Sequence, residues 1–131
     1  MIVRPYEYGD EMHVANSREF MVVADQSWAW TVEDNDIILA VVGCSQFMAG
    51  TGHLWAQISE DIRGKGFSFT KKMRKMIEIT IARQEYKRIQ AFALSDNEEN
   101  GRWLKVLGMK KESTMIAAYG GRDMDVYARI I

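Results

Sequence analysis

Residues 61–66 read Asp-Ile-Arg-Gly-Lys-Gly and lie between a segment of alternating apolar residues and a long amphipathic segment. Two glycines on either side of one residue allow a sharp turn and leave the backbone N–H groups uncovered. A helix that begins there adds its own unpaired N–H groups and the positive end of its dipole. The stretch therefore predicts an anion site, most often one for a phosphate or pyrophosphate. A purely structural strand-to-helix turn is the alternative.

The segments on either side of this turn predict a strand–helix–strand crossover. Apolar and other residues alternate over 53–59, as in a strand. After the turn, Phe69, Met73 and Ile77 recur at helical spacing, while lysines and arginines fill the opposite face. A second strand follows over Arg88–Leu94. The turn then lies at the carboxyl end of the first strand, where open α/β sheets bind ligands.

The remaining segments complete a predicted α/β (α+β) fold, one domain over residues 1–131. We expect a mixed central sheet of about six to seven strands with helices on both faces. The further elements are a strand over 2–5, a helix over 10–24 capped by Asp10, strands over 28–32 and 37–43, a helix over 97–107 capped by Asp96 or Asn97 and stopped by Gly108, and strands over 110–118 and 124–131 around Gly120-Gly121.

Composition narrows the functional class. The chain has 131 residues, of which 47% are hydrophobic and 27% charged, as in an ordinary globular domain. A net charge of -1 favours neither nucleic acid nor an anionic membrane as partner. Cys44, the only cysteine, suits a reducing, cytoplasmic compartment. No apolar run reaches the ~18 residues of a membrane helix, and Arg4 and Glu7 interrupt any signal-peptide pattern.

Two stretches together resemble the signatures of the GCN5-related N-acetyltransferase (GNAT) family. Residues 61–66 resemble its pyrophosphate loop, normally Gln/Arg-x-x-Gly-x-Gly/Ala. Residues 97–109, Asn-Glu-Glu-Asn-Gly-Arg-Trp-Leu-Lys-Val-Leu-Gly-Met, resemble its second signature, with the usual spacing from Asn97 to Gly108. The predicted order of elements also matches the family along essentially the whole chain. The resemblance implies acetyl-CoA as cofactor and transfer of an acetyl group to a primary amine of a small molecule or protein.

The resemblance also implies a set of cofactor contacts. Backbone N–H groups from Arg63 to Ser68 would hold the pyrophosphate of coenzyme A. The positive charges of the Arg63 and Lys65 side chains would add attraction. Asn97 would hydrogen-bond the pantetheine arm, or only cap its helix, and the two roles are compatible. The cofactor-binding residues predicted in this way are Ile58, Arg63, Gly64, Lys65, Gly66, Phe67, Ser68 and Asn97.

Acetyl transfer further needs an oxyanion donor and a proton acceptor. Ile58 or Ser59 would supply the backbone N–H for the oxyanion, because both end the strand near the cofactor. The base candidates are Glu33, Glu60, His53 and Asp96. Of these we select Glu33, because it sits in the hairpin turn near which family members bind acceptors. The predicted catalytic residues are therefore Glu33 and Ser59.

Two positions depart from the family pattern. Asp61 stands where the family usually has Gln or Arg, close to a site for phosphates. Leu104 stands where many members place the tyrosine that protonates the departing thiolate. The alternative function is therefore a catalytically silent structural or interaction protein. Residues 53–74 and 102–104 also resemble small acetyltransferase-like proteins of T7-like bacteriophages, which implies the host cytoplasm or a virion.

Three features stay open at this stage. Lys71, Lys72, Arg74 and Lys75 could meet the 3′-phosphate of coenzyme A or a nucleic acid, or form a solvated helix face. Trp28 and Trp30 share one face of a strand and could line an acceptor pocket or pack in the core. The last two strands could pair across a homodimer.

Overall fold

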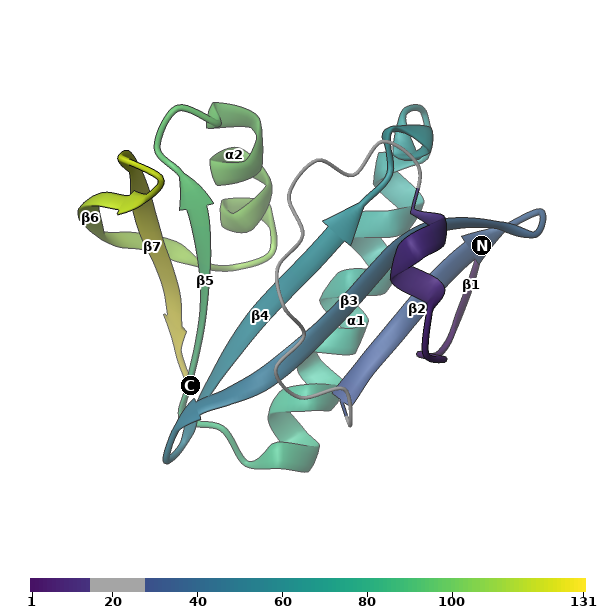
Figure 1. The fold of residues 1–131 in the computed structure, drawn as a ribbon. Coiled ribbons are helices and arrows are strands. Elements are labelled where there is room, and N and C mark those ends of the chain that lie inside the picture. The colour runs from purple at the N-terminus through teal and green to yellow at the C-terminus, as the bar shows by residue number, and fades with distance from the viewer. Residues whose placement is uncertain (15–27) are drawn as a thin grey trace.

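The computed structural model describes residues 1–14 and 28–131. Within these residues, seven strands form one sheet in the order β1-β2-β3-β4-β5-β7-β6 (Figure 1). The β4–β5 pair is parallel and the other neighbours are antiparallel, so the sheet is mixed, as predicted. The strands are β1 (Ile2–Pro5), β2 (Ala29–Asp34), β3 (Ile37–Met48), β4 (Thr51–Ile58), β5 (Arg88–Leu94), β6 (Lys110–Tyr119) and β7 (Arg122–Ile130).

Two α-helices cover one face of this sheet. They are α1 (Gly66–Gln84) and α2 (Glu98–Val106), and both contribute to the main hydrophobic core. Helix α1 buries Phe69, Met73, Ile77 and Thr80, the helical stripe expected from the sequence. In the view of Figure 1, α1 lies behind the sheet and the short 3₁₀ helix η1 (Asp10–His13) lies in front of it. A second 3₁₀ helix, η3 (Glu60–Ile62), connects β4 to α1.

Helix η1 begins differently from the prediction. Gly9, not Asp10, is its N-cap, and most of the helix predicted over 10–24 lies outside the described residues. The buried Asp10 carboxylate instead accepts hydrogen bonds from Arg4 at 2.9 and 3.2 Å, from Thr31 Oγ1 at 2.6 Å and from the Glu7 N–H at 2.9 Å. Burial raises the pKa of Asp10, but these hydrogen bonds outweigh it and lower the pKa to about 2.

Strands β4 and β5 are paired only at their first residues. The register joins Thr51 to Arg88, Gly52 to Ile89 and His53 to Gln90, and pairing ends there. Beyond that point β4 stays paired with β3 and β5 with β7, so the two halves of the sheet diverge as a V (Figure 1). Gly52 allows the close approach at the base, because a Cβ there would meet Tyr86 at 2.6 Å and Cys44 Sγ at 2.7 Å.

The second half of the chain follows its local signals closely. Asn97 caps α2, its side chain accepting from the Asn100 N–H at 3.0 Å. Gly108 follows the helix with φ 97°, and Gly120 and Gly121 turn β6 into β7. Among the described residues, no helix is long and apolar enough to cross a membrane.

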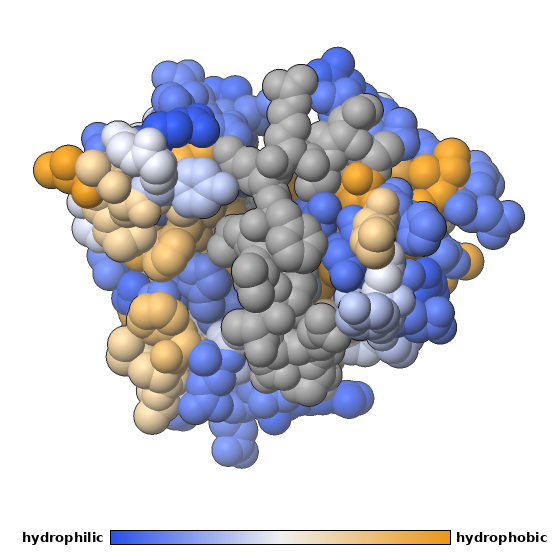
Figure 2. All heavy atoms as spheres, viewed as in Figure 1, coloured by the Kyte–Doolittle hydropathy of each residue, from blue (hydrophilic) through white to orange (hydrophobic). Residues whose placement is uncertain are grey.

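The sheet face seen in Figure 2 is mostly polar. Apolar residues appear there over the β3–β4 hairpin, over the β6–β7 end and on the side of β1, β2 and η1. Exposed apolar side chains in these segments include Phe47, Met48 and Ile116.

Candidate functional site

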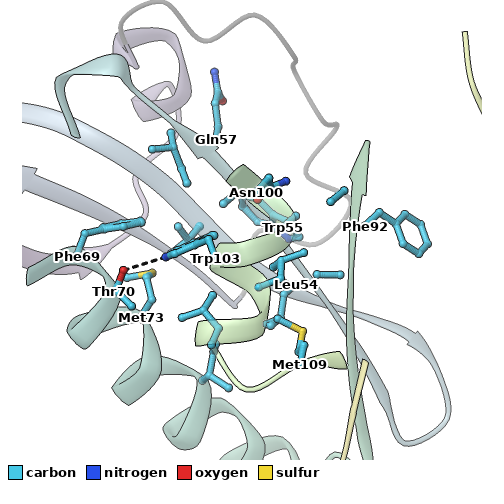
Figure 3. A pocket seen from close by; sticks show the side chains of 18 of the residues that line it. Leu54, Trp55, Gln57, Phe69, Thr70, Met73, Phe92, Asn100, Trp103 and Met109 are labelled. Carbon is cyan, nitrogen blue, oxygen red and sulfur yellow. Dashed lines mark hydrogen bonds between the residues drawn. The ribbon is translucent and has the colours of Figure 1, made fainter. Parts of the chain in front are cut away.

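A cleft of about 990 Å³ opens where β4 and β5 separate. Its walls come from β2, β3, β4, η3, α1, β5 and α2, elements that are distant in sequence. Figure 3 labels side chains from four of these elements, among them Leu54 from β4, Phe69 from α1, Phe92 from β5 and Asn100 from α2. Concave, mostly apolar sites of this size are typical of small-molecule and cofactor binding.

The backbone of β4 presents unpaired groups to this cleft. The Ser59 N–H donates to the Leu39 carbonyl at 2.8 Å, so these opposite residues form a hydrogen-bonded pair. Such pairs alternate along an antiparallel ladder. Residues 56 and 58 therefore direct their N–H and C=O groups away from β3, toward the side where β5 has separated beyond the His53–Gln90 pair. The middle of the sheet thus contains an open strand edge, which can pair with an extended ligand that carries amides.

The glycine turn places four free N–H groups at the mouth of the cleft. The N–H groups of Arg63 and Lys65 donate to the carbonyls of Glu60 and Ile62, at 3.2 and 2.8 Å. The first intrahelical bond of α1 runs from Phe69 to Lys65, and the Lys65 side chain makes no capping bond. Within the described part of the chain, the free N–H groups are those of Gly64, Gly66, Phe67 and Ser68. The predicted anion site therefore has fewer backbone donors than expected, because the amides of Arg63 and Lys65 are already bonded.

This turn also has room for a bound group. A Cβ placed at Gly64 or at Gly66 would meet no atom within 4 Å. Gly64 has φ 79°, in the left-handed region that favours glycine, whereas Gly66 has an ordinary φ. Four N–H donors beside open space at a helix N-terminus fit a phosphate or pyrophosphate.

The charged side chains near the turn differ from the prediction in one respect. Arg63 is exposed and lines the cleft, as a phosphate partner would. The Lys65 ammonium is instead 3.1 Å from Asp34 Oδ2, in the β2–β3 turn, so its charge is already paired. Asp61 is exposed, does not line the cleft, and donates its N–H to Ser59 Oγ at 3.0 Å. The unfavourable carboxylate at this position therefore lies away from the cradle.

Ser59 is not available for its predicted catalytic role. It is 1% exposed, its N–H is bonded to Leu39 and its Oγ accepts from Asp61. Its amide is therefore already occupied, which favours Ile58 of the two predicted oxyanion donors. Ile58, one residue earlier, directs its N–H toward the cleft and keeps this predicted role.

The base candidates fall into two groups. Glu33 accepts a hydrogen bond from Arg4 at 3.2 Å and does not line the cleft, so the structure does not bring it to the other site residues. Asp96 is paired with Arg122 at 2.9 Å, also outside the cleft. His53 and Glu60 both line the cleft. Burial lowers the pKa of His53, which lies at the base of the V with its ring 4.4 Å from that of Phe92.

Helices α1 and α2 are joined directly across the cleft wall. Trp103 donates its indole N–H to Thr70 Oγ1 at 2.9 Å and stacks on Phe69, with ring centroids 5.6 Å apart (Figure 3). No local pattern in the sequence predicts this contact, since its partners are 33 residues apart. Leu104 is 5% exposed in the core, and none of the tyrosines in the described residues lines the cleft.

Asn97 lies in the cleft wall, as its predicted role requires. Its side-chain oxygen is occupied by the helix cap, while its amide NH₂ group can donate to a ligand. The two roles proposed for this residue are thus sterically and chemically compatible.

Comparison with known proteins places this geometry in a fold family. No protein-family model matches the sequence, and no curated protein does. A point variant of the spermidine N-acetyltransferase SpeG from Vibrio cholerae matches with a TM-score of 0.80 at 14% identity, over 99% of this chain and 95% of that chain. The chain has the GNAT fold.

Two other solved structures support the same assignment of fold. A GNAT-family acetyltransferase from Bacillus anthracis has a TM-score of 0.76 at 14% identity, over 98% of this chain and 93% of that chain. The ribosomal L7/L12 alpha-N-protein acetyltransferase RimL, in complex with coenzyme A, has a TM-score of 0.68 at 17% identity. That match covers 79% of this chain and 63% of the other. At these identities the similarity concerns the fold of the GNAT acetyltransferases.

Proposed function

We propose that this protein binds acetyl-CoA and transfers the acetyl group to a primary amine of a small molecule or protein. One observation carries the proposal. The parallel strands β4 and β5 separate after three residue pairs, and the opening leads to the uncapped N-terminus of α1. An extended ligand that has amides along its length and phosphates at one end is complementary to this arrangement.

Each part of coenzyme A has a matching part of the site. The amides of the pantetheine arm would pair with the open edge of β4 at residues 56 and 58. The pyrophosphate would accept hydrogen bonds from Gly64, Gly66, Phe67 and Ser68, with Arg63 adding positive charge. The coenzyme A complex of RimL, which shares the fold, supports the cofactor assignment.

The chemistry requires little from the chain beyond positioning. When bound, acetyl-CoA supplies a thioester whose carbonyl carbon the neutral amine attacks, and the C–S bond breaks. The Ile58 N–H would donate to the carbonyl oxygen as its negative charge develops. Glu60 lines the cleft directly after β4, so we assign it as the acceptor of the amine proton, in place of Glu33. No side chain of the cleft is assigned to protonate the leaving thiolate, and water would supply this proton, because a thiol with a pKa near 8.5 needs no strong acid.

Substitution of Gly66 tests cofactor binding without disturbing the fold. Gly66→Glu places a carboxylate in open space at the first turn of α1, which helix electrostatics favours. We expect unchanged or slightly higher thermal stability and no detectable acetyl-CoA binding by calorimetry. Ala82→Glu, exposed near the other end of α1, adds the same charge as a matched control and should bind like the wild type. Wild-type affinity in the Gly66→Glu variant would place the phosphates elsewhere.

A second candidate function rests on Leu104. Its position in the core leaves the cleft without a tyrosine among the described residues, so a silent GNAT-fold protein that binds the cofactor is the alternative. A bacteriophage context, as a virion or host-targeting protein, belongs with this candidate. Release of free thiol from acetyl-CoA in the presence of a broad amine panel, including polyamines and peptide N-termini, separates the two. Binding without thiol release would favour the silent protein.

A further inference from the structure

One tryptophan differs from the other three in its hydrogen bonding. Three indole N–H groups each donate to a hydroxyl oxygen, at 2.8, 3.2 and 2.9 Å: Trp28 to Thr80, Trp55 to Ser45 and Trp103 to Thr70. The fourth, Nε1 of Trp30, is fully buried and has no partner among the described residues. Trp30 therefore carries a strong donor that the described residues leave unused.

An unused buried donor needs an explanation. Leaving such a group unsatisfied opposes folding, and native proteins bond the great majority of theirs. The neighbouring Trp28, in edge contact with Trp30 at a centroid distance of 6.0 Å, shows that hydroxyl partners are within reach of this part of β2. Because the described residues offer no partner, an ordered water, a ligand or a group outside the described residues completes the Trp30 indole.

The position of Trp30 favours a ligand. It lines the cleft, together with β4, α1 and α2. Across the sheet it is in register with Val42 of β3, which is in register with Ala56 of β4. Ala56 is one of the residues whose backbone faces the gap between β4 and β5. The indole thus lies level with the open edge that we assign to the pantetheine arm, on the face covered by α1.

We propose that the Trp30 indole N–H donates a hydrogen bond to a carbonyl oxygen of the acyl-CoA bound in the cleft. This inference rests on the proposed function and adds a side-chain donor to its backbone contacts. Two carbonyls share the required chemistry, the thioester carbonyl of the acyl group and the amide carbonyls of the arm. Acetyl-CoA contains both kinds, whereas free coenzyme A contains only the amides.

A matched pair of substitutions tests the proposal. Trp30→Phe removes an unused donor, so the melting temperature of the unliganded protein should stay equal or rise. Its Kd for acetyl-CoA should increase about tenfold, the loss of one hydrogen bond to a ligand. Trp28→Phe removes a satisfied bond to Thr80 and should lower the melting temperature while leaving the Kd unchanged.

The outcomes separate this inference from the proposed function. Weakened binding of acetyl-CoA alone assigns the thioester carbonyl, and equal weakening for free coenzyme A assigns an arm amide; both support the proposal. If Trp30→Phe lowers the melting temperature and keeps the wild-type Kd, the indole is bonded to water and the inference is wrong, while the proposed function stands. Wild-type protein that fails to bind acetyl-CoA would overturn both.

A measurement on the wild-type protein covers the case in which a variant does not fold. The four indole N–H signals are resolved in a nitrogen-15 correlation spectrum and assigned from the tryptophan variants that do fold. Addition of acetyl-CoA should move the Trp30 indole signal most, and downfield, as a new hydrogen bond forms. A Trp30 signal that stays in place while backbone amides of β4 shift would overturn the inference.

Discussion

Asp10→Asn should destabilise the protein in a pH-dependent way. The Asp10 carboxylate is 7% exposed and pairs with Arg4, and its hydrogen bonds lower its pKa from 3.8 to about 2. One pKa unit corresponds to about 1.4 kcal/mol, so the ionised carboxylate contributes about 2 kcal/mol to the free energy of unfolding. Because the folded pKa is depressed, this contribution is complete above pH 4 and is lost as the pH falls through 2.

Urea denaturation followed by tryptophan fluorescence at pH 7, 5, 4 and 3 measures this effect. The Asn side chain keeps the size of Asp but cannot form the charged pair with Arg4. We expect the variant to be about 2 kcal/mol less stable at pH 7, with the difference from wild type shrinking below pH 4. Asp36→Asn, in an exposed turn position with φ 65°, serves as the matched control and should change little. Equal stability of wild type and Asp10→Asn at pH 7 would refute the reasoning.

Three further substitutions or treatments test other parts of the structure. Glu60→Gln should lower kcat for thiol release at least tenfold and leave the Kd for acetyl-CoA unchanged. Glu33→Gln should leave kcat unaltered. Steady-state kinetics with the best amine of the panel shows which of the two glutamates accepts the proton. Gly64→Ala should lower the free energy of unfolding by about 1 kcal/mol, because φ is 79°, while Gly66→Ala should not, which thermal melts can compare. Burial raises the pKa of the Cys44 thiol to about 11, so iodoacetamide at pH 8 should alkylate it only after unfolding, as mass spectrometry would detect.

Local signals in the sequence predicted much of the fold. β5 spans Arg88–Leu94 as expected, Asn97 caps α2 and Gly108 ends it, because these features depend on neighbouring residues. The anion site at the glycine turn follows from the same kind of reasoning. The sequence could not predict which N–H groups of the turn are free. In the structure, those of Arg63 and Lys65 already donate to backbone carbonyls.

Long-range pairing explains what the sequence could not predict. Glu33 is paired with Arg4, 29 residues away, and the Lys65 ammonium with Asp34. Both ion pairs depend on how β1, β2 and the glycine turn lie relative to one another in the fold. The spacing of residues along the sequence does not predict that arrangement. The separation of β4 from β5 after His53 is equally invisible in the sequence, because an alternating strand looks the same whether its edge is paired or open.

The same limit applies to the tryptophans. Trp28 and Trp30 occupy equivalent positions of one strand face, so the sequence offers both a pocket role and a core role for each. The structure distinguishes them, since Trp28 is bonded to Thr80 and Trp30 has an unused donor in the cleft.

The central claim is that coenzyme A lies between β4 and β5 with its phosphates on the N-terminus of α1. A titration of nitrogen-15 labelled protein with coenzyme A, followed by backbone amide shifts, tests it most directly. If coenzyme A binds there, the largest shifts will be those of Ala56, Ile58, Gly64 and Gly66. Shifts confined to the basic outer face of α1 around Arg74, or no shifts at millimolar coenzyme A, would contradict it.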